Sequence, residues 1–522
     1  MELKNTVFLI ILVSAFSIVS SLEAQNRAAE KPNIVFIFAD DMGYGDVSHL
    51  NPEARTVTPH IDNLARNGLT FSNAHASASV CTPSRYGFLT GRYAWRSESG
   101  GGVVDGFAKP VMEQGRETIA SLLKNAGYTT ACIGKWHLGI NWQTKDGSSQ
   151  AVFDPKTGFS NVDYTKKISK GPNDYGFDYS FIHPASLDMP PYMFLRNHQA
   201  IDPDVVLTSD IYPDSLEDTE YSWDKKHTSE PDVYWGKGVW WRRGEISRTF
   251  KVENCLTDIL ADGISFIENY ASEKPSQPFF LYLPLTGPHT PWIPTENFKG
   301  KSSIGTYGDF IMDIDHVVGQ ITATLQKLGI EENTIVIFSS DNGAYWPQEE
   351  IDLNNHDSNW GTRGQKGDVW DGGHRIPLII SWPSHLKEKL VYHHLVSLTD
   401  FFATFADLTN QKPQKNSGED SFSFLHVLNG NTSKITRTSM IHQSSGGLYS
   451  IRMDGWKFID GLGSGGFTAP SKIDPELGGP TGQLYKINSD SLESENLFLQ
   501  NPEIVKKLQK DLNKQIEEGY NR

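Results

Sequence analysis

The chain has 522 residues, of which 38% are hydrophobic and 21% are charged, and its formal net charge is -16. This length suits one large α/β domain with a smaller companion, and the composition is that of an ordinary globular protein. The charge balance lacks the basic footprint of a nucleic-acid-binding protein, so we expect no nucleic acid partner. An anionic substrate held in a local basic pocket is not excluded.

The first residues have the pattern of a secretory signal peptide. Lys4 precedes an apolar run over residues 7–19, and small and polar residues follow up to a cleavage point at Ala24. The run is short for a membrane span. We therefore expect residues 1–24 to direct export to the periplasm or the extracellular space, with no stable membrane anchor. An uncleaved anchor is the alternative interpretation.

Apolar runs that resemble buried parallel strands alternate with helical patterns between residues 30 and 430. The strand-like runs cover residues 33–39, 129–134, 279–285, 334–340 and 376–382. The helical patterns cover residues 58–67, 118–125, 256–271 and 307–328. This alternation predicts an α/β fold with a large, mostly parallel sheet sandwiched by helices.

The pattern changes from about Asn431. Short strand-like runs over 448–453, 456–459 and 483–487 are separated by Gly, Asp and Asn, and a terminal helix follows from Asn501. Its apolar side chains form one stripe, namely Ile504, Leu508, Leu512 and Ile516. Residues 431–522 are therefore predicted to form a C-terminal α+β subdomain, an antiparallel sheet with a packing helix.

Polar residues follow the predicted strands where the strands end. They are Asp40 and Asp41 after the first, Lys135 and His137 after the second, His289 beyond the third, and Asp341 and Asn342 after the fourth. Ligands of open α/β sheets bind outside the carboxyl ends of the strands. We therefore expect these side chains to form one site at one edge of the sheet.

The carboxylates of this set indicate a metal ion. Asp40, Asp41 and Asp341 would crowd together with the amide of Asn342, and like charges so close need a cation. Oxygen ligands alone suit Ca²⁺ better than Mg²⁺, which usually keeps several waters, or zinc, which favours His and Cys. One Ca²⁺ per chain is the prediction.

The three cysteines are Cys81, Cys132 and Cys255, and an odd count leaves at least one thiol unpaired. Whether Cys132 and Cys255 pair stays open, and Cys81 is the best candidate for a thiol with a special role. It begins the string CTPSR over 81–85, which is followed by LTGR over 89–92. This string resembles the signature of the type I sulfatase family, which belongs to the alkaline phosphatase-like superfamily.

The resemblance extends along most of the chain. Further strings that match the family in order lie at residues 40–46, 58–65, 134–139 (GKWHLG), 288–291, 340–343, 364–367 and 372–377, and the tail also fits at 484–485 and 495–497. The stretch over 185–246 matches least well. The resemblance implies an alkaline phosphatase-like fold and the hydrolysis of sulfate monoesters.

The resemblance also implies how the nucleophile is made and held. A maturation enzyme oxidises Cys81 to formylglycine, and one hydroxyl of its hydrate attacks sulfur after activation by the metal and Asp341. Arg85 steadies the modified residue. The implied metal ligands are Asp40, Asp41, modified Cys81, Asp341 and Asn342.

The remaining roles follow from the same resemblance. Lys135, Lys366 and Ser186 hold sulfate oxygens together with the metal. His289, alone or shared with Lys366, is the general acid for the leaving alcohol. His137 is the base that removes the proton of the second hydroxyl, so that the covalent sulfate is expelled and the aldehyde returns.

The long stretch over 185–246 is rich in aromatic and basic residues. It contains Trp223, Trp235, Trp240 and Trp241, with Lys237, Arg242 and Arg243 between and beside them. It is either a substrate-binding loop or a loop that its aromatic residues pack onto the body of the protein. If it is a binding loop, it favours a sulfated oligo- or polysaccharide as the substrate, by analogy with the family.

Two other functions are alternatives to the sulfatase interpretation. A phosphonate or phosphodiester hydrolase of the same superfamily is the nearest enzymatic alternative, and the GKWHLG string favours sulfate over it. A non-catalytic carbohydrate-binding protein on the same scaffold would show degenerate motifs, whereas every expected catalytic residue is present.

Overall fold

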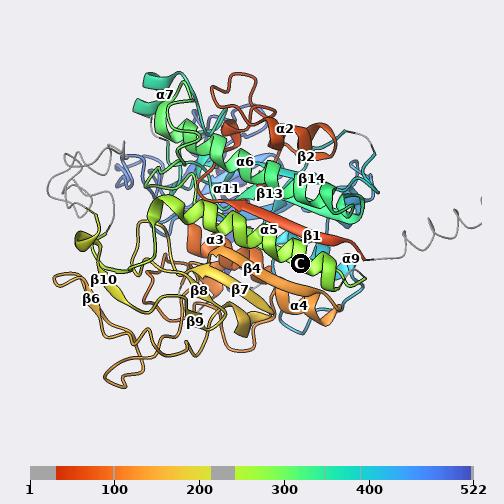
Figure 1. Ribbon diagram of the computed structural model, residues 1–522. Coiled ribbons are helices and arrows are strands. Elements are labelled where there is room, and N and C mark those ends of the chain that lie inside the picture. Colours follow the sequence, from red (N-terminus) through yellow and green to blue (C-terminus); the bar gives the residue numbers. More distant parts are fainter. Residues whose placement is uncertain are drawn as a thin grey trace, which may run out of the picture.

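The computed structural model describes residues 31–97, 100–212, 242–274, 276–346, 348–387 and 389–518 (Figure 1). The predicted signal peptide lies outside these residues. So do Lys237 and the four tryptophans that the sequence analysis singled out, Trp223, Trp235, Trp240 and Trp241. Among the described residues, no helix combines the length and apolar character that a membrane crossing requires.

A large sheet forms the centre of the molecule, in the strand order β15-β2-β14-β13-β1-β12-β4-β7-β8-β9. Strands β13, β1, β12, β4 and β7 run parallel to one another. The strands of this sheet are β1 (Asn33–Ala39), β2 (Leu69–Phe71), β4 (Thr129–Lys135), β7 (Tyr179–His183), β8 (Leu195–Arg196), β9 (Gln199–Ala200), β12 (Phe279–Pro284), β13 (Thr334–Ser340), β14 (Leu378–Ser381) and β15 (Leu390–Tyr392).

Both faces of this sheet are buried, as its continuous apolar strands predict. In β1, Ile34 and Phe36 point into one hydrophobic core, and Val35 and Ile37 point into a second core on the other face. Helices α3 (Cys81–Thr90), α4 (Ile119–Asn125) and α9 (Asp400–Leu408) cover the first core. Helices α2 (Pro59–Arg66), α5 (Cys255–Glu273) and α6 (Gly305–Lys327) cover the second, and Figure 1 shows α5 and α6 running along the sheet.

These elements confirm the predicted α/β class, with one correction. The run over 376–382 was expected to be a parallel strand, but β14 pairs antiparallel with β13. The chain between these strands does not return to the end of the sheet where β13 begins. It stays at the end where β13 finishes, and there Lys366 donates to Asp41. A strand that starts from this end must run in the opposite direction.

Short strand pairs and short helices lie in the segments that connect the main elements. The two-stranded pairs are β16 (Val396–Ser397) with β3 (Ala74–His75), β5 (Phe153–Asp154) with β6 (Phe159–Ser160), and β10 (Val205–Leu207) with β11 (Glu245–Ser247). The short helices are α7 (Gln348–Asn354), α8 (Asp371–His374) and α10 (Leu425–Leu428).

A second, antiparallel sheet follows near the C-terminus, as the sequence predicts. Its strands are β17 (Ser439–Gln443), β18 (Tyr449–Met453), β19 (Trp456–Ile459) and β20 (Gln483–Tyr485), and they pair in this order. Helix α11 (Pro502–Glu518) packs on this sheet through Val505, Leu508 and Leu512. The sequence analysis missed β17, whose short run SMIHQ lacks a clear apolar alternation.

Candidate active site

The first residue of helix α3 is Cys81, which lies next to the carboxyl end of β1. Its thiol is buried and donates a hydrogen bond to Asp40 Oδ1 at 3.5 Å. Burial raises the pKa of this thiol well above its ordinary value. Because the thiolate is the nucleophilic form of cysteine, the unmodified Cys81 side chain is a poor nucleophile here.

Arg85 lies one turn further along α3, so its side chain faces the same way as Cys81. Its Nε and Nη2 atoms donate to Asp341 Oδ2 at 3.0 and 2.8 Å, and Nη2 also donates to Asp40 Oδ1 at 3.2 Å. The guanidinium group is completely buried. Arg85 therefore connects Asp40, which follows β1, with Asp341, which follows β13.

The acidic residues come together because β1 and β13 are neighbours and end in register, with Ala39 paired with Ser340. The backbone N–H of Asp41 donates to Asp341 Oδ1 at 3.2 Å. Asn342 Nδ2 donates to Asp41 Oδ1 at 2.7 Å. Asp41 has a φ of +66°, which turns the chain sharply at the end of β1.

The crowding of these carboxylates shifts their pKa values. Burial raises the pKa of Asp341 to about 7, and the neighbouring Asp40 and Asp41 add to this while Arg85 opposes it. Burial also acts to raise the pKa of Asp40, but Lys135, His289 and Arg85 outweigh it and hold that pKa well below its usual range. A bound cation would favour the ionised form of Asp341 and reduce the repulsion from Asp40 and Asp41.

Two lysines approach the same carboxylates. Lys135, the last residue of β4, donates from Nζ to Asp40 Oδ2 at 2.6 Å and to Ser186 Oγ at 3.1 Å. Lys366 donates from Nζ to Asp41 Oδ2 at 2.7 Å. Burial disfavours the charged form of Lys366, but Asp41 outweighs this and raises its pKa, so the ammonium stays protonated.

His289 lies between the second lysine and Ser186. Its Nε2 atom is 3.7 Å from Asp41 Oδ2 and its Nδ1 atom is 3.5 Å from Ser186 Oγ. Burial lowers the pKa of His289, and the charge of Lys366 lowers it further. This imidazole therefore reaches both the carboxylate cluster and the lysine-bound hydroxyl.

His137 follows Lys135 by two residues and contacts the start of α3. Its Nε2 atom is 2.8 Å from the carbonyl of Val104, which can only accept, so Nε2 carries the proton. Burial lowers the pKa of His137 well below its ordinary value, and its buried Nδ1 atom has no hydrogen-bond partner among the described residues. The ring is thus neutral, with a lone pair available. The hydroxyl of Thr82 donates to the His137 carbonyl at 3.0 Å and ties this residue to the start of α3.

The structure thus brings together all the site residues predicted from the sequence. The cluster consists of Asp40, Asp41, Cys81, Arg85, Lys135, His137, Ser186, His289, Asp341, Asn342 and Lys366. Each of them contacts another member directly except His137, whose carbonyl accepts from the hydroxyl of Thr82, the residue after Cys81.

The sequence analysis missed one buried charge at the border of this cluster. Asp188 follows Ser186 by two residues, and its side chain lies 3.8 Å from the guanidinium of Arg242. The signal available in the sequence was the position of Asp188, two residues after the predicted sulfate-binding residue Ser186.

The donor set fits a calcium ion. The Oδ1 atom of Asn342 is buried and accepts no hydrogen bond. One ligand atom each from Asp40, Cys81 and Asp341 lie within 4.8 Å of one another, as do one each from Asp41, Cys81 and His289. An unpartnered amide oxygen beside three carboxylates supplies the hard oxygen ligands that Ca²⁺ prefers.

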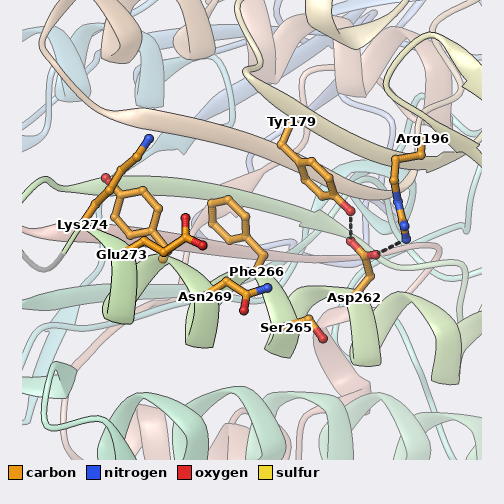
Figure 2. A pocket seen from close by; sticks show the side chains of 9 residues that line it. Tyr179, Arg196, Asp262, Ser265, Phe266, Asn269, Glu273 and Lys274 are labelled. Carbon is orange, nitrogen blue, oxygen red and sulfur yellow. Dashed lines mark hydrogen bonds and ion pairs between the residues drawn. The ribbon is translucent and has the colours of Figure 1, made fainter.

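A pocket of about 400 Å³ lies elsewhere, where α5 meets β7 and β8. Figure 2 shows that Asp262 accepts from both Tyr179 and Arg196 at one end of it, while Glu273 and Lys274 lie at the other end. None of its lining residues belongs to the cluster described above.

Comparison with known proteins identifies the family. The sulfatase family model matches residues 32–411. An N-acetylgalactosamine-6-O-sulfatase from Bacteroides thetaiotaomicron is 34% identical over 496 residues, which cover 92% of this chain and 92% of that protein. The chain belongs to the type I sulfatase family. It is therefore a sulfuric ester hydrolase.

Two further relatives of this sulfatase extend the comparison. Human arylsulfatase A is 29% identical over 500 residues, covering 92% of this chain and 86% of that protein. A solved structure from work on the metabolism of multiple glycosaminoglycans by Bacteroides thetaiotaomicron has a TM-score of 0.76 at 31% identity, and covers 93% of this chain and 99% of that chain. The fold and the sulfatase family are thus shared along nearly the whole described length.

Proposed function

We propose that this sulfatase hydrolyses sulfate monoesters of carbohydrates, with a formylglycine nucleophile made from Cys81 and one bound Ca²⁺. The observation that carries the proposal is the convergence on Cys81 of three carboxylates and three cations from separate parts of the chain. The buried thiol of Cys81 is itself a poor nucleophile, which favours its conversion by a maturation enzyme. The carbohydrate class is supported by the relative that acts on N-acetylgalactosamine 6-O-sulfate.

Calcium would be held by Asp40, Asp41, Asp341 and Asn342 with modified Cys81, and when bound it supplies positive charge that polarises a sulfate oxygen. Arg85 holds Asp40 and Asp341 in place beside the nucleophile. This network fixes the position of the reacting residue.

The other side chains bind the sulfate group and move protons. Lys135 and Lys366 present ammonium groups to sulfate oxygens, and Ser186 is oriented by Lys135. His289, with Lys366 beside it, gives a proton to the departing sugar oxygen. His137 offers the lone pair of Nδ1 as the base that returns the modified residue to its aldehyde form. In the balanced reaction, a sulfate monoester and water give an alcohol, a sulfate dianion and one proton.

The proposal is tested by producing the chain together with a formylglycine-generating enzyme. A peptide mass that shows formylglycine at position 81, with turnover of an aryl sulfate and of a 6-sulfated N-acetylgalactosamine saccharide, is the expected result. An aryl phosphodiester assayed in parallel tests the phosphodiesterase alternative. Faster hydrolysis of that ester, or turnover by a preparation with unmodified Cys81, would contradict the proposal.

We also propose that residues 1–24 direct export, because the predicted signal pattern precedes the folded body. The mature chain recovered from the periplasm or the medium should begin after Ala24. A full-length chain retained in the cytoplasm would contradict this.

A further inference from the structure

A buried carboxylate with one unpaired oxygen lies at the border of the active site. Asp188 lies in the turn that follows β7, and its side chain is 3% exposed. Its Oδ1 atom is buried and accepts no hydrogen bond from the residues that the structure describes. Leaving such an oxygen unsatisfied is costly, and native structures rarely do so without a reason.

The turn that carries Asp188 is fixed by its neighbours. The backbone N–H of Met189 donates to the carbonyl of Ser186 at 2.8 Å, and the His183 ring lies 3.0 Å from that same carbonyl. Ser186 in turn bonds to Lys135. The Asp188 carboxylate is therefore held at a set distance from the sulfate-binding residues.

Arg242 faces the other oxygen of Asp188. Its Nη2 atom lies 3.8 Å from Asp188 Oδ2, and its side chain is 27% exposed. Two hydrogen bonds fix the backbone of Arg242. Its N–H donates to the Asp188 carbonyl at 3.2 Å, and its carbonyl accepts from the hydroxyl of Tyr192 at 2.9 Å. The Asp188 carboxylate, an acceptor, and the Arg242 guanidinium, a donor, thus lie side by side near Ser186, at the border of the site.

We propose that Asp188 and Arg242 together recognise a free hydroxyl on the sugar ring that carries the scissile sulfate. This inference rests on the proposed function. A sugar hydroxyl both donates and accepts, so it can donate to Asp188 Oδ1 while it accepts from the guanidinium of Arg242. Hydrogen bonds to charged groups are the stronger ones, and they give such a pair discriminating power.

Asp188 disfavours an anionic substituent at the ring position that the pair contacts. A second sulfate or a carboxylate at that ring position has no proton to donate and would place negative charge against Asp188. The substrate is therefore a sugar with an unsulfated hydroxyl near the scissile ester.

The test compares Asp188→Ala and Asp188→Asn with the wild type on two substrates, a 6-sulfated N-acetylgalactosamine saccharide and 4-nitrophenyl sulfate, which has no sugar hydroxyls. For Asp188→Ala we expect kcat/KM on the saccharide to fall roughly 10- to 100-fold. This loss should exceed the loss on the aryl sulfate at least about tenfold. Deoxy analogues of the saccharide then locate the hydroxyl. The wild type should discriminate against one of them, and Asp188→Ala should lose that discrimination.

Asp204→Ala is the matched control, because Asp204 forms an exposed pair with Arg248 at 2.7 Å in the same part of the chain. It should leave both rates as in the wild type, and thermal unfolding should show each variant folded. Equal losses on the two substrates would show that Asp188 only positions Ser186, and an unchanged saccharide rate would show no contact. Either result overturns this inference while wild-type sulfatase activity stands. A wild type inactive on every sulfate ester overturns the proposed function itself, and this inference with it.

Discussion

The buried ammonium group of Lys457, in strand β19, donates to the carboxylate of Asp371 at 2.9 Å. Asp371 begins α8 and lies five residues after Lys366, so this bond connects the C-terminal sheet to the segment that carries an active-site lysine. Glu493 strengthens the connection, because its carboxylate accepts from the Asp371 backbone at 2.7 Å and lies 2.8 Å from Lys457 Nζ. Arg452 pairs with Asp371 as well, at 2.7 Å. The C-terminal sheet thus holds one wall of the active site.

Replacing Lys457 with Met should destabilise the protein by about 3–5 kcal/mol, because it leaves buried carboxylates short of a partner. The free energy of unfolding in urea measures this. Lys507→Met is the matched control, since Lys507 forms an exposed pair with Asp454 at 2.8 Å and should change stability by less than about 1 kcal/mol. Similar losses in the two variants would show that the buried network does not stabilise the fold.

Cys81→Ala should fold and unfold like the wild type but have no measurable sulfatase activity, because it cannot form the hydrated aldehyde. Circular dichroism and an aryl sulfate assay check the two expectations. Cys255→Ala is the control, since Cys255 is also buried and free but lies at the start of α5. It should cost about 1 kcal/mol of stability and keep its activity. Activity in the Cys81 variant would remove this residue as the nucleophile.

Removing calcium should lower both activity and thermal stability. Without the ion, three carboxylates and the Asn342 Oδ1 atom, which lacks a partner among the described residues, lose the cation that they bind. An ion present at 100 times its Kd stabilises the folded state by about 2.7 kcal/mol. Chelation followed by differential scanning calorimetry measures the shift, and added Ca²⁺ should restore it. Metal analysis that finds zinc, or no cation, in active enzyme would contradict the assignment.

The sequence predicted which polar side chains meet at the ends of the strands better than it predicted the elements around them. Asp40 and Asp341 could be placed together because each ends an apolar run, and parallel strands deliver their carboxyl ends to one edge. The same reasoning failed for β14, because the direction of a strand depends on the path of the preceding loop. The pairing of Asp188 with Arg242, and of Asp371 with Lys457, joins residues far apart in the chain. No local pattern marks such partners.

A buried carboxyl group of α6 gives the fold a dependence on pH. Asp313 is 3% exposed and accepts from the backbone N–H of Thr295 at 2.8 Å, and burial raises its pKa to about 6. Between its ordinary pKa of 3.8 and about 6, the folded state binds this proton and the unfolded state does not. Stability therefore falls as pH rises through this window, and the cost persists at higher pH.

Asp313→Asn should remove this cost, because the amide keeps an acceptor for Thr295 and never ionises. We expect the variant to gain stability over the wild type on the order of 2 kcal/mol above about pH 7, and the gain to vanish below about pH 4. Urea unfolding of both proteins across this range measures the difference. Comparing the two proteins matters, because burial also raises the pKa of Asp315 to about 6 and its titration shapes both curves. A stability difference that stays constant with pH would show that Asp313 does not titrate in this window.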